Sequence, residues 1–202
     1  VFECRGEIYC IPETHRAKEM SLYKAEEFPQ RWKKVSVLVK NVAGVDPTIF
    51  QYEGRWWLAS TDKKEGEHSK LYLWHALDLF GPWQPHGANP VKTDISSTRP
   101  AGTPFVHHGY LYRPAQDCSK TYGGRVVINR VIQLTSTEFK EKPAVTIAPF
   151  KGSPYLESLH TLSSVGNFTL VDGKRSIIIK NALKDTFHKI EAFISQKLLK
   201  IY

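Results

Sequence analysis

The chain has 202 residues, a mass of 23.1 kDa and a formal net charge of +8 at pH 7. Hydrophobic residues make up 41% and charged residues 24%, a balance that excludes a disordered chain and is enough to build a real core. No apolar run approaches the roughly 20 residues of a membrane-spanning helix. The 3 cysteines, an odd number without CxxC spacing, argue against a disulfide framework and a structural zinc site, and favour a reducing, cytoplasmic compartment.

The basic charge is scattered along the chain. Lysines and arginines fall mostly in expected turns and near the C-terminus, beside acids such as Asp62 and Glu65. We therefore expect a solvated surface, with weak attraction to an anionic membrane as the alternative and no specific nucleic-acid binding. The chain starts at Val1 with no signal peptide after it, so we expect a fragment, a processed product or a trimmed chain.

In chain order, the same local pattern occurs four times. A strand leads into a tight turn with glycine, and a second strand returns; glycine suits the positive φ of such turns. In the first three copies an aromatic residue stands three positions after the glycine. The copies and their turn glycines are 2–13 (Gly6), 50–61 (Gly54), 105–116 (Gly109) and 168–176 (Gly173).

Two further short strands follow each of the first three hairpins. Four strands in a period of about 50 residues, with an aromatic signature, are typical of a β-propeller blade. We therefore predict an all-β fold, a five-bladed-type propeller of which about three full blades and a partial fourth are visible. A β-sandwich is the alternative, although a sandwich needs no fixed period.

The last segment has a different period. Apolar residues recur there at spacings of three or four, which predicts an amphipathic α-helix that packs on the propeller or covers an open edge. We accordingly expect two parts, a propeller over 1–180 that is truncated at its N-terminus and a helix over 181–202. The apolar residues are Leu183, Phe187, Ile190, Ile194 and Leu198.

A propeller binds its ligands where the inner strands begin around the central channel. Asp46, Arg99 and His160 precede the inner strands of the second, third and fourth units, so we expect them at one channel end. Glu13, at the end of a second strand, would bring another carboxylate there. Paired carboxylates are what glycoside cleavage requires, with Asp46 as base or nucleophile and Glu13 as acid.

The remaining candidates lie on the second strand of the third unit. We expect Tyr112, Arg113, Gln116 and Asp117 to contribute to substrate binding. Arg99, Arg113 and His160 could bind an anionic group such as a carboxylate or phosphate. No phosphate-binding loop, no HExxH sequence and no other histidine spacing of a metal site is present, so we expect no metal and no cofactor.

Each candidate also has a structural interpretation. Asp46 precedes a proline, so it could serve a turn, and Glu13 could pair with Arg16 or Arg113. Arg99 could bridge two blades, and His160 could be a hydrogen-bonded core histidine.

Several strings of the sequence occur together in one known family. They are Phe2–Cys4, Ile11–Thr14, Asp46–Phe50, Trp56–Leu58, Gly81–Trp83, Asn89–Val91, Arg99–Gly102, Leu111–Cys118, Tyr122–Gly123, His160–Leu162 and Val171–Gly173. Over residues 1 to about 175 they resemble the propeller region of the glucosamine inositolphosphorylceramide transferase family. That region is similar to the five-bladed propellers of arabinanase- and levansucrase-type glycoside hydrolases. The resemblance implies acidic residues around a central cavity, with Asp46 in the place of a catalytic carboxylate and Glu13 as its partner.

Two departures limit what the resemblance implies. Plant members carry a separate glycosyltransferase domain, where the transfer chemistry is expected, and Arg99 and His160 occupy positions where acids would be expected. The leading hypothesis is a carbohydrate-active propeller module that handles a glycan or glycolipid head group in cell-surface polysaccharide metabolism, by glycosyl transfer or glycoside cleavage. The alternatives are a non-catalytic sugar-binding or scaffold domain of a glycosyltransferase, and a protein-interaction platform with an exposed apolar patch.

Overall fold

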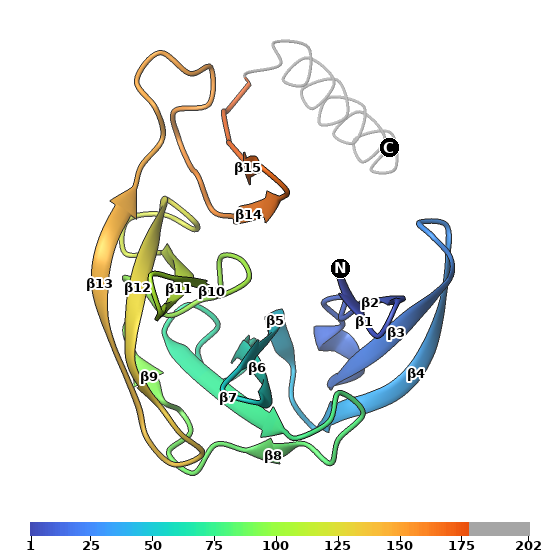
Figure 1. The fold of residues 1–202 in the computed structure, drawn as a ribbon. Coiled ribbons are helices and arrows are strands. Elements are labelled where there is room, and N and C mark those ends of the chain that lie inside the picture. The colour runs from blue at the N-terminus through green and yellow to red at the C-terminus, as the bar shows by residue number, and fades with distance from the viewer. Residues whose placement is uncertain (178–202) are drawn as a thin grey trace, which may run out of the picture.

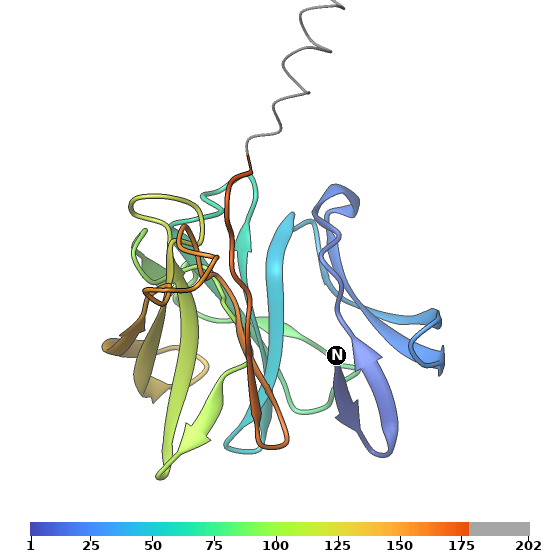
Figure 2. The same cartoon turned by 90° about the horizontal axis from the view of Figure 1, so that it is seen from above.

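The computed structural model describes residues 1–177, and the helix predicted within 181–202 lies outside them. The described chain forms two four-stranded blades, a five-stranded blade between them and a two-stranded hairpin, arranged radially around a central channel (Figures 1 and 2). The fold is the predicted β-propeller. The number of blades in a closed ring stays a prediction.

In each blade the strands follow one another outward from the channel, and every neighbouring pair is antiparallel. A short 3-10 turn, η1 (His15–Ala17), precedes the third strand of the first blade. The first blade contains β1 (Phe2–Cys4), β2 (Glu7–Cys10), β3 (Glu19–Glu27) and β4 (Arg31–Lys40). The second contains β5 (Gly44–Tyr52), β6 (Arg55–Asp62), β7 (Lys70–Ala76), β8 (Gln84–Pro85) and β9 (Lys92–Thr93). The third contains β10 (Phe105–His107), β11 (Tyr110–Asp117), β12 (Arg125–Leu134) and β13 (Phe139–Ile147), and the hairpin contains β14 (Leu162–Val165) and β15 (Phe168–Val171).

The innermost hairpins of the three blades turn as the sequence predicts. In each, two residues with positive φ connect the strands, and the second is glycine. This backbone is that of a type I′ turn, whose twist matches that of the flanking strands. The turn pairs are Arg5–Gly6 (φ 55° and 78°), Glu53–Gly54 (48° and 72°) and His108–Gly109 (47° and 76°).

The turn of the fourth hairpin is not at the predicted glycine. Gly166, with φ 54°, opens the turn between β14 and β15, whereas Gly173 follows β15. Here glycine occupies the first turn position instead of the second, so the repeated spacing pointed to the wrong residue. Gly173 has a packing role instead, because a Cβ there would lie 2.6 Å from Cβ of Tyr155.

The outer strand of the second blade is interrupted. Both β8 and β9 pair with β7, and the chain leaves the sheet between them. In this gap the carboxamide of Asn89 replaces a strand: its Nδ2 donates to the carbonyl of Leu73 and its Oδ1 accepts the Leu73 amide. The outer strand of this blade is therefore only partly formed.

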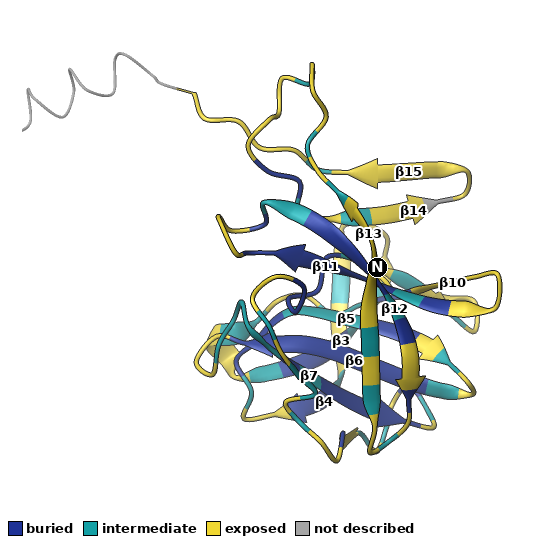
Figure 3. Cartoon of the chain, turned by 90° about the vertical axis from the view of Figure 1, so that its left-hand side faces the viewer, coloured by how far each residue is buried: buried dark blue, intermediate teal, exposed yellow. Residues whose placement is uncertain are grey.

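The core lies in layers between successive blades. Because side chains alternate across a strand, Trp56 faces the first blade and its neighbour Trp57 faces the third. A third cluster, with Val126 and Leu159, joins the third blade to the segment leading into β14. Figure 3 shows the long buried stretches of β6, β7 and β11, whereas β15 is exposed. The tryptophans of the repeats are therefore core residues and do not line the channel.

Gly102 fixes the junction between the third blade and β14. Its φ is +141°, and a Cβ there would lie 1.9 Å from the carbonyl oxygen of Leu162, whose amide donates to Ala101 O at 2.7 Å. We expect Gly102→Ala to lower the free energy of unfolding by about 2–3 kcal/mol, through overpacking. Gly6→Ala, where φ is +78° and no atom lies near the added Cβ, should cost about 1 kcal/mol. Urea unfolding measures the free energy of unfolding of both variants. Equal losses would contradict the conclusion that close packing at Gly102 excludes a side chain.

Two buried histidines should make the stability of the fold depend on pH. His75 and His86 pack against Trp57, and burial lowers the pKa of both below the usual value near 6.5. The unfolded chain therefore binds protons that the folded chain excludes, so stability is full above about pH 6.5 and falls as the pH drops below it. Urea unfolding between pH 7.5 and 5 should show this loss, and His86→Gln should reduce its slope. A flat profile would show that neither histidine stays neutral.

Candidate functional site

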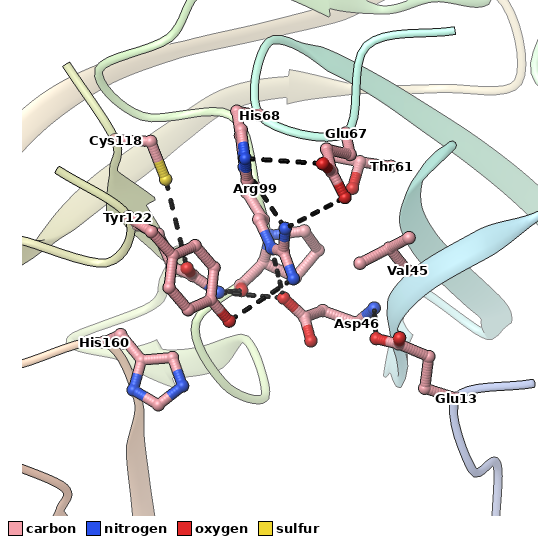
Figure 4. A network of polar contacts seen from close by, with 12 residues as sticks. Glu13, Val45, Asp46, Thr61, Glu67, His68, Arg99, Cys118, Tyr122 and His160 are labelled. Atoms are coloured by element: carbon pink, nitrogen blue, oxygen red, sulfur yellow. Dashed lines mark hydrogen bonds and ion pairs between the residues drawn. The ribbon is translucent and has the colours of Figure 1, made fainter. Parts of the chain in front are cut away.

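The site is built around a kink in β5. The pairing of β5 with β6 shifts between Val45 and Thr48, and Asp46, within this bulge, has a φ of 49°. Bulges re-aim a side chain, and the left-handed backbone suits Asp better than most residues. The Asp46 amide donates to Oε2 of Glu13, 3.1 Å away on the first blade. The Asp-Pro dipeptide thus shapes the strand and also turns the carboxylate toward the channel (Figure 4).

Two buried donors hold one oxygen of the Asp46 carboxylate. Nε of Arg99 lies 2.6 Å from Oδ2, and Nε2 of Gln116 lies 2.8 Å from the same atom. Gln116 is 1% exposed, and its Nε2 also donates to Pro100 O at 2.9 Å. The other oxygen, Oδ1, has no hydrogen-bond partner among residues 1–177, and the Asp46 side chain is 31% exposed. The result is a rigid carboxylate with one oxygen available to a ligand.

Arg99 joins the second and third blades. Its Nη1 lies 3.2 Å from Nδ1 of His68 and 3.8 Å from Oε2 of Glu67, and its guanidinium carbon lies 4.7 Å from the ring centroid of Tyr122. Burial alone would lower the pKa of Arg99, but the Asp46 carboxylate outweighs it and the net shift is upward. The charge is compensated from within the protein, so Arg99 holds the site together instead of offering itself to an anion.

His160 forms the far wall of the site. Its ring centroid lies 5.5 Å from that of Tyr122, and its Nδ1 pairs with Oδ2 of Asp172. The amides of His160 and Thr161 donate to Oδ1 of the same aspartate, at 2.9 and 2.7 Å. Gly123 has no Cβ to block the close approach of the His160 side chain. The imidazole is thereby oriented toward Tyr122 and the channel (Figure 4).

Three residues of the site lie outside the repeated hairpins and were not predicted from them. Glu67 and His68 lie in the connection 63–69 between β6 and β7, and Tyr122 lies in the connection 118–124 between β11 and β12. Such connections end at the same side of a blade as the start of its inner strand. This topology could have pointed to them, although Tyr122 entered the sequence analysis only through a family string.

Arg113 does not reach this site. Its Nε and Nη2 bind the two oxygens of Glu141 at 2.9 and 2.6 Å, and its remaining donors bind the carbonyls of Thr98 and Ser97. Lys92 adds a second cation 2.8 Å from Glu141. Burial would raise the pKa of Glu141, but Arg113 and then Lys92 reverse this, and the pKa is lowered. Arg113 thus belongs to a buried structural ion pair with Glu141 and is only 2% exposed, so it does not face a substrate.

Tyr112 and Asp117 also lie apart from Asp46. The Tyr112 ring stacks on Phe105 with centroids 5.7 Å apart, and Asp117 binds Arg125 at 2.9 Å and the amide of Ser119 at 2.9 Å. The structure therefore groups Glu13, Asp46, Arg99, Gln116 and His160, and it leaves Tyr112, Arg113 and Asp117 outside the group.

The electrostatic balance of the site is acidic although the chain is basic. Asp46 and Glu67 contact the buried Arg99, and Lys63 pairs with Glu67. Two more carboxylates lie nearby, since Glu13 accepts the Asp46 amide and Asp172 binds His160. This balance favours a neutral polyhydroxyl ligand over an anion, the opposite of what the sequence suggested for Arg99. A small cavity of about 120 Å³ continues along the channel. Its lining includes Phe2, Ile11, Pro47, Thr48 and Gly102. Within residues 1–177, no three His, Cys, Asp or Glu side chains come together as a metal site.

The Arg113–Glu141 pair generates a stability prediction. Glu141→Gln leaves a buried guanidinium with an incomplete partner, so we expect a loss of about 3–5 kcal/mol in the free energy of unfolding. The double variant Arg113→Met, Glu141→Leu removes both charges and should lose much less. Denaturant unfolding measures the free energy of unfolding of both variants. The prediction is wrong if the double variant is less stable than Glu141→Gln.

Comparisons with known proteins agree with this architecture. Residues 1–152 match the family model described as glucosamine inositolphosphorylceramide transferase 1, N-terminal. Glucosamine inositolphosphorylceramide transferase 1 of Oryza sativa subsp. japonica is 39% identical over 148 residues, which cover 71% of this chain and 20% of the relative. The protein of that name from Arabidopsis thaliana is 36% identical over 149 residues, 70% of this chain and 19% of the relative. The chain thus spans about a fifth of the length of these relatives.

Among solved structures, an exo-beta-1,3-galactanase from Clostridium thermocellum superposes with a TM-score of 0.55 at 10% identity, over 87% of this chain and 44% of that one. At this identity the likeness concerns the fold alone. The family match covers most of the chain and agrees with the strings singled out in the sequence. The chain belongs to the family of the N-terminal region of glucosamine inositolphosphorylceramide transferase 1.

Proposed function

We propose that this propeller module binds the polyhydroxylated head group of a glycan or glycolipid at the channel end around Asp46. The observation that carries the proposal is the state of the Asp46 carboxylate. Two buried donors fix Oδ2, and Oδ1 faces the channel. A fixed carboxylate oxygen is a strong acceptor for sugar hydroxyls, and its orientation is set before the ligand arrives.

The surrounding groups support a sugar-like ligand. Tyr122 and His160 lie beside the Asp46 carboxylate with their ring centroids 5.5 Å apart, and the acidic balance disfavours an anion at that point (Figure 4). The relatives are named for glucosamine and for inositolphosphorylceramide, and both contain a ring with several hydroxyl groups. We propose that such a ring lies against Tyr122 while its hydroxyls donate to Asp46.

Glycosyl transfer or cleavage is the second candidate. The observation in its favour is that the Glu13 carboxylate of the first blade lies 3.1 Å from the backbone amide of Asp46 on the second blade. Glu13, however, uses Oε2 to accept the Asp46 amide, and its Oε1 lies 3.1 Å from Nδ1 of His15. A general acid must offer a proton to its substrate, so these contacts fit a positioning role for Glu13 better.

Three variants test the proposal. Asp46→Asn should weaken the binding of glucosamine or myo-inositol roughly tenfold, because a charged acceptor is lost. Glu13→Gln should bind like the wild type, since its amide oxygen still accepts the Asp46 amide, whereas Glu13→Ala should weaken binding. Calorimetric titration measures the affinities. Asp78→Asn, which alters an exposed carboxylate paired with Arg5, is the matched control.

The same variants separate the two candidates. If Asp46→Asn and the control bind both probes with wild-type affinity, the binding site is wrongly placed. If the wild type hydrolyses a chromogenic glycoside, and Glu13→Gln abolishes turnover while binding persists, Glu13 is an acid and the module is an enzyme. Thermal unfolding of each variant shows whether a lost affinity reflects a lost fold.

A further inference from the structure

The turn between β3 and β4 projects away from the propeller. We define the hairpin tip as residues 25–34. In β3 only Tyr23 and Lys24 pair with β2, so beyond them the two strands continue without a third. All residues from Glu26 to Arg31 are exposed. Figures 1 and 2 show this hairpin reaching outside the rest of the first blade. The tip is therefore free to contact something other than the protein's own core.

An aromatic pair occupies the hairpin tip. Phe28 is 54% exposed, and its ring packs edge-on against Trp32 with centroids 6.0 Å apart. The indole Nε1 donates to the carbonyl of Pro29 at 2.9 Å. Neither ring belongs to any of the three hydrophobic clusters of the core. Two large aromatic side chains are thus held in place at the surface, where burial in the fold does not account for them.

Basic side chains follow this pair in β4, and two glutamates, Glu26 and Glu27, precede it in β3. Lys33 lies directly opposite Lys24 in the β3–β4 register, a like-charge arrangement that destabilises a hairpin unless anions compensate it. Lys24 has a partner in Glu7 at 2.8 Å, whereas Lys33 has no carboxylate partner among residues 1–177. Arg31 is held by the neighbouring Glu26 at 3.3 Å. Lys33 therefore remains available to an external anion.

We propose that the hairpin tip docks this module on an anionic lipid surface. Aromatic rings with a polar edge settle at the head-group level of a bilayer, and each lysine near an anionic surface adds attraction. In this arrangement Phe28 and Trp32 enter the interface and Lys33 contacts lipid phosphates. The net charge of +8 acts in the same direction. Within residues 1–177 no helix is long and apolar enough to cross a membrane.

The proposal adds a location to the proposed function but stands on other residues. A glycolipid head group is presented at a lipid surface, so a module held there would meet its ligand at high local concentration. The tip lies on the first blade away from Asp46, so the two sites can be tested one at a time.

Vesicle co-sedimentation tests the docking surface. We expect the chain to bind vesicles of phosphatidylcholine with 30% phosphatidylserine better than vesicles of phosphatidylcholine alone, with binding weakened by salt. Phe28→Ala and Trp32→Ala should each lower the partition coefficient roughly tenfold. Lys33→Gln should lower it a few-fold and reduce the salt dependence. The controls are Phe80→Ala and Lys140→Gln, which alter an exposed aromatic and an exposed lysine on other blades.

Fluorescence gives an independent reading of the same contact. The emission of the wild type should shift to the blue when anionic vesicles are added, and Trp32→Phe should lose most of this shift. The proposal would be overturned if the tip variants partitioned onto vesicles as strongly as the wild type. It would also be overturned if the control variants lost as much vesicle binding as the tip variants. A loss of affinity for soluble glucosamine in the tip variants, without loss of vesicle binding, would overturn it as well and assign the tip to sugar binding.

The vesicles contain no glycolipid, so the result does not depend on the channel. Asp46→Asn should bind them like the wild type even if the proposed head-group site proves wrong.

Discussion

One buried cation, Arg99, determines how the channel end is built. Its guanidinium contacts Asp46 and His68 on the second blade and Tyr122 on the third. A charge taken out of water must be compensated by the protein, so these groups are held at fixed positions. A second buried arginine, Arg113, does the same deeper in the third blade through Glu141. The boundary between the second and third blades is therefore fixed by polar geometry as well as by apolar packing.

The sequence predicted the parts of the fold that depend on local backbone chemistry. Three glycine turns marked the inner hairpins, and topology then placed Asp46 and Arg99 at one channel end. The fourth turn was missed because Gly166 sits one position earlier within its turn. The partners of Arg113 could not be read, because β11 is buried along most of its length and its residues show no alternation that tells one face from the other. Side-chain pairing between strands that are not neighbours in the chain is decided in three dimensions and has no local signal.

Family strings that looked arbitrary now have physical reasons. In Arg99–Gly102, the arginine binds Asp46, the Pro100 carbonyl accepts Gln116, and the glycine admits the backbone of β14. In Leu111–Cys118, Leu111 packs in the cluster between the second and third blades, Arg113 pairs with Glu141, and Gln116 donates to Asp46 at the channel end. A string of this kind is constrained at nearly every position, which explains why it identified the family when composition could not.

The gap in the outer strand of the second blade has a consequence for association. An uninterrupted outer strand offers a row of free backbone amides and carbonyls to a strand from another molecule. Here the Asn89 carboxamide occupies the backbone groups of Leu73, and the chain turns away on both sides of it. On the third blade, two register shifts and Pro143 interrupt β13 in the same way. The outer edges of the second and third blades are therefore irregular, and they offer few straight stretches of strand on which aggregation could begin.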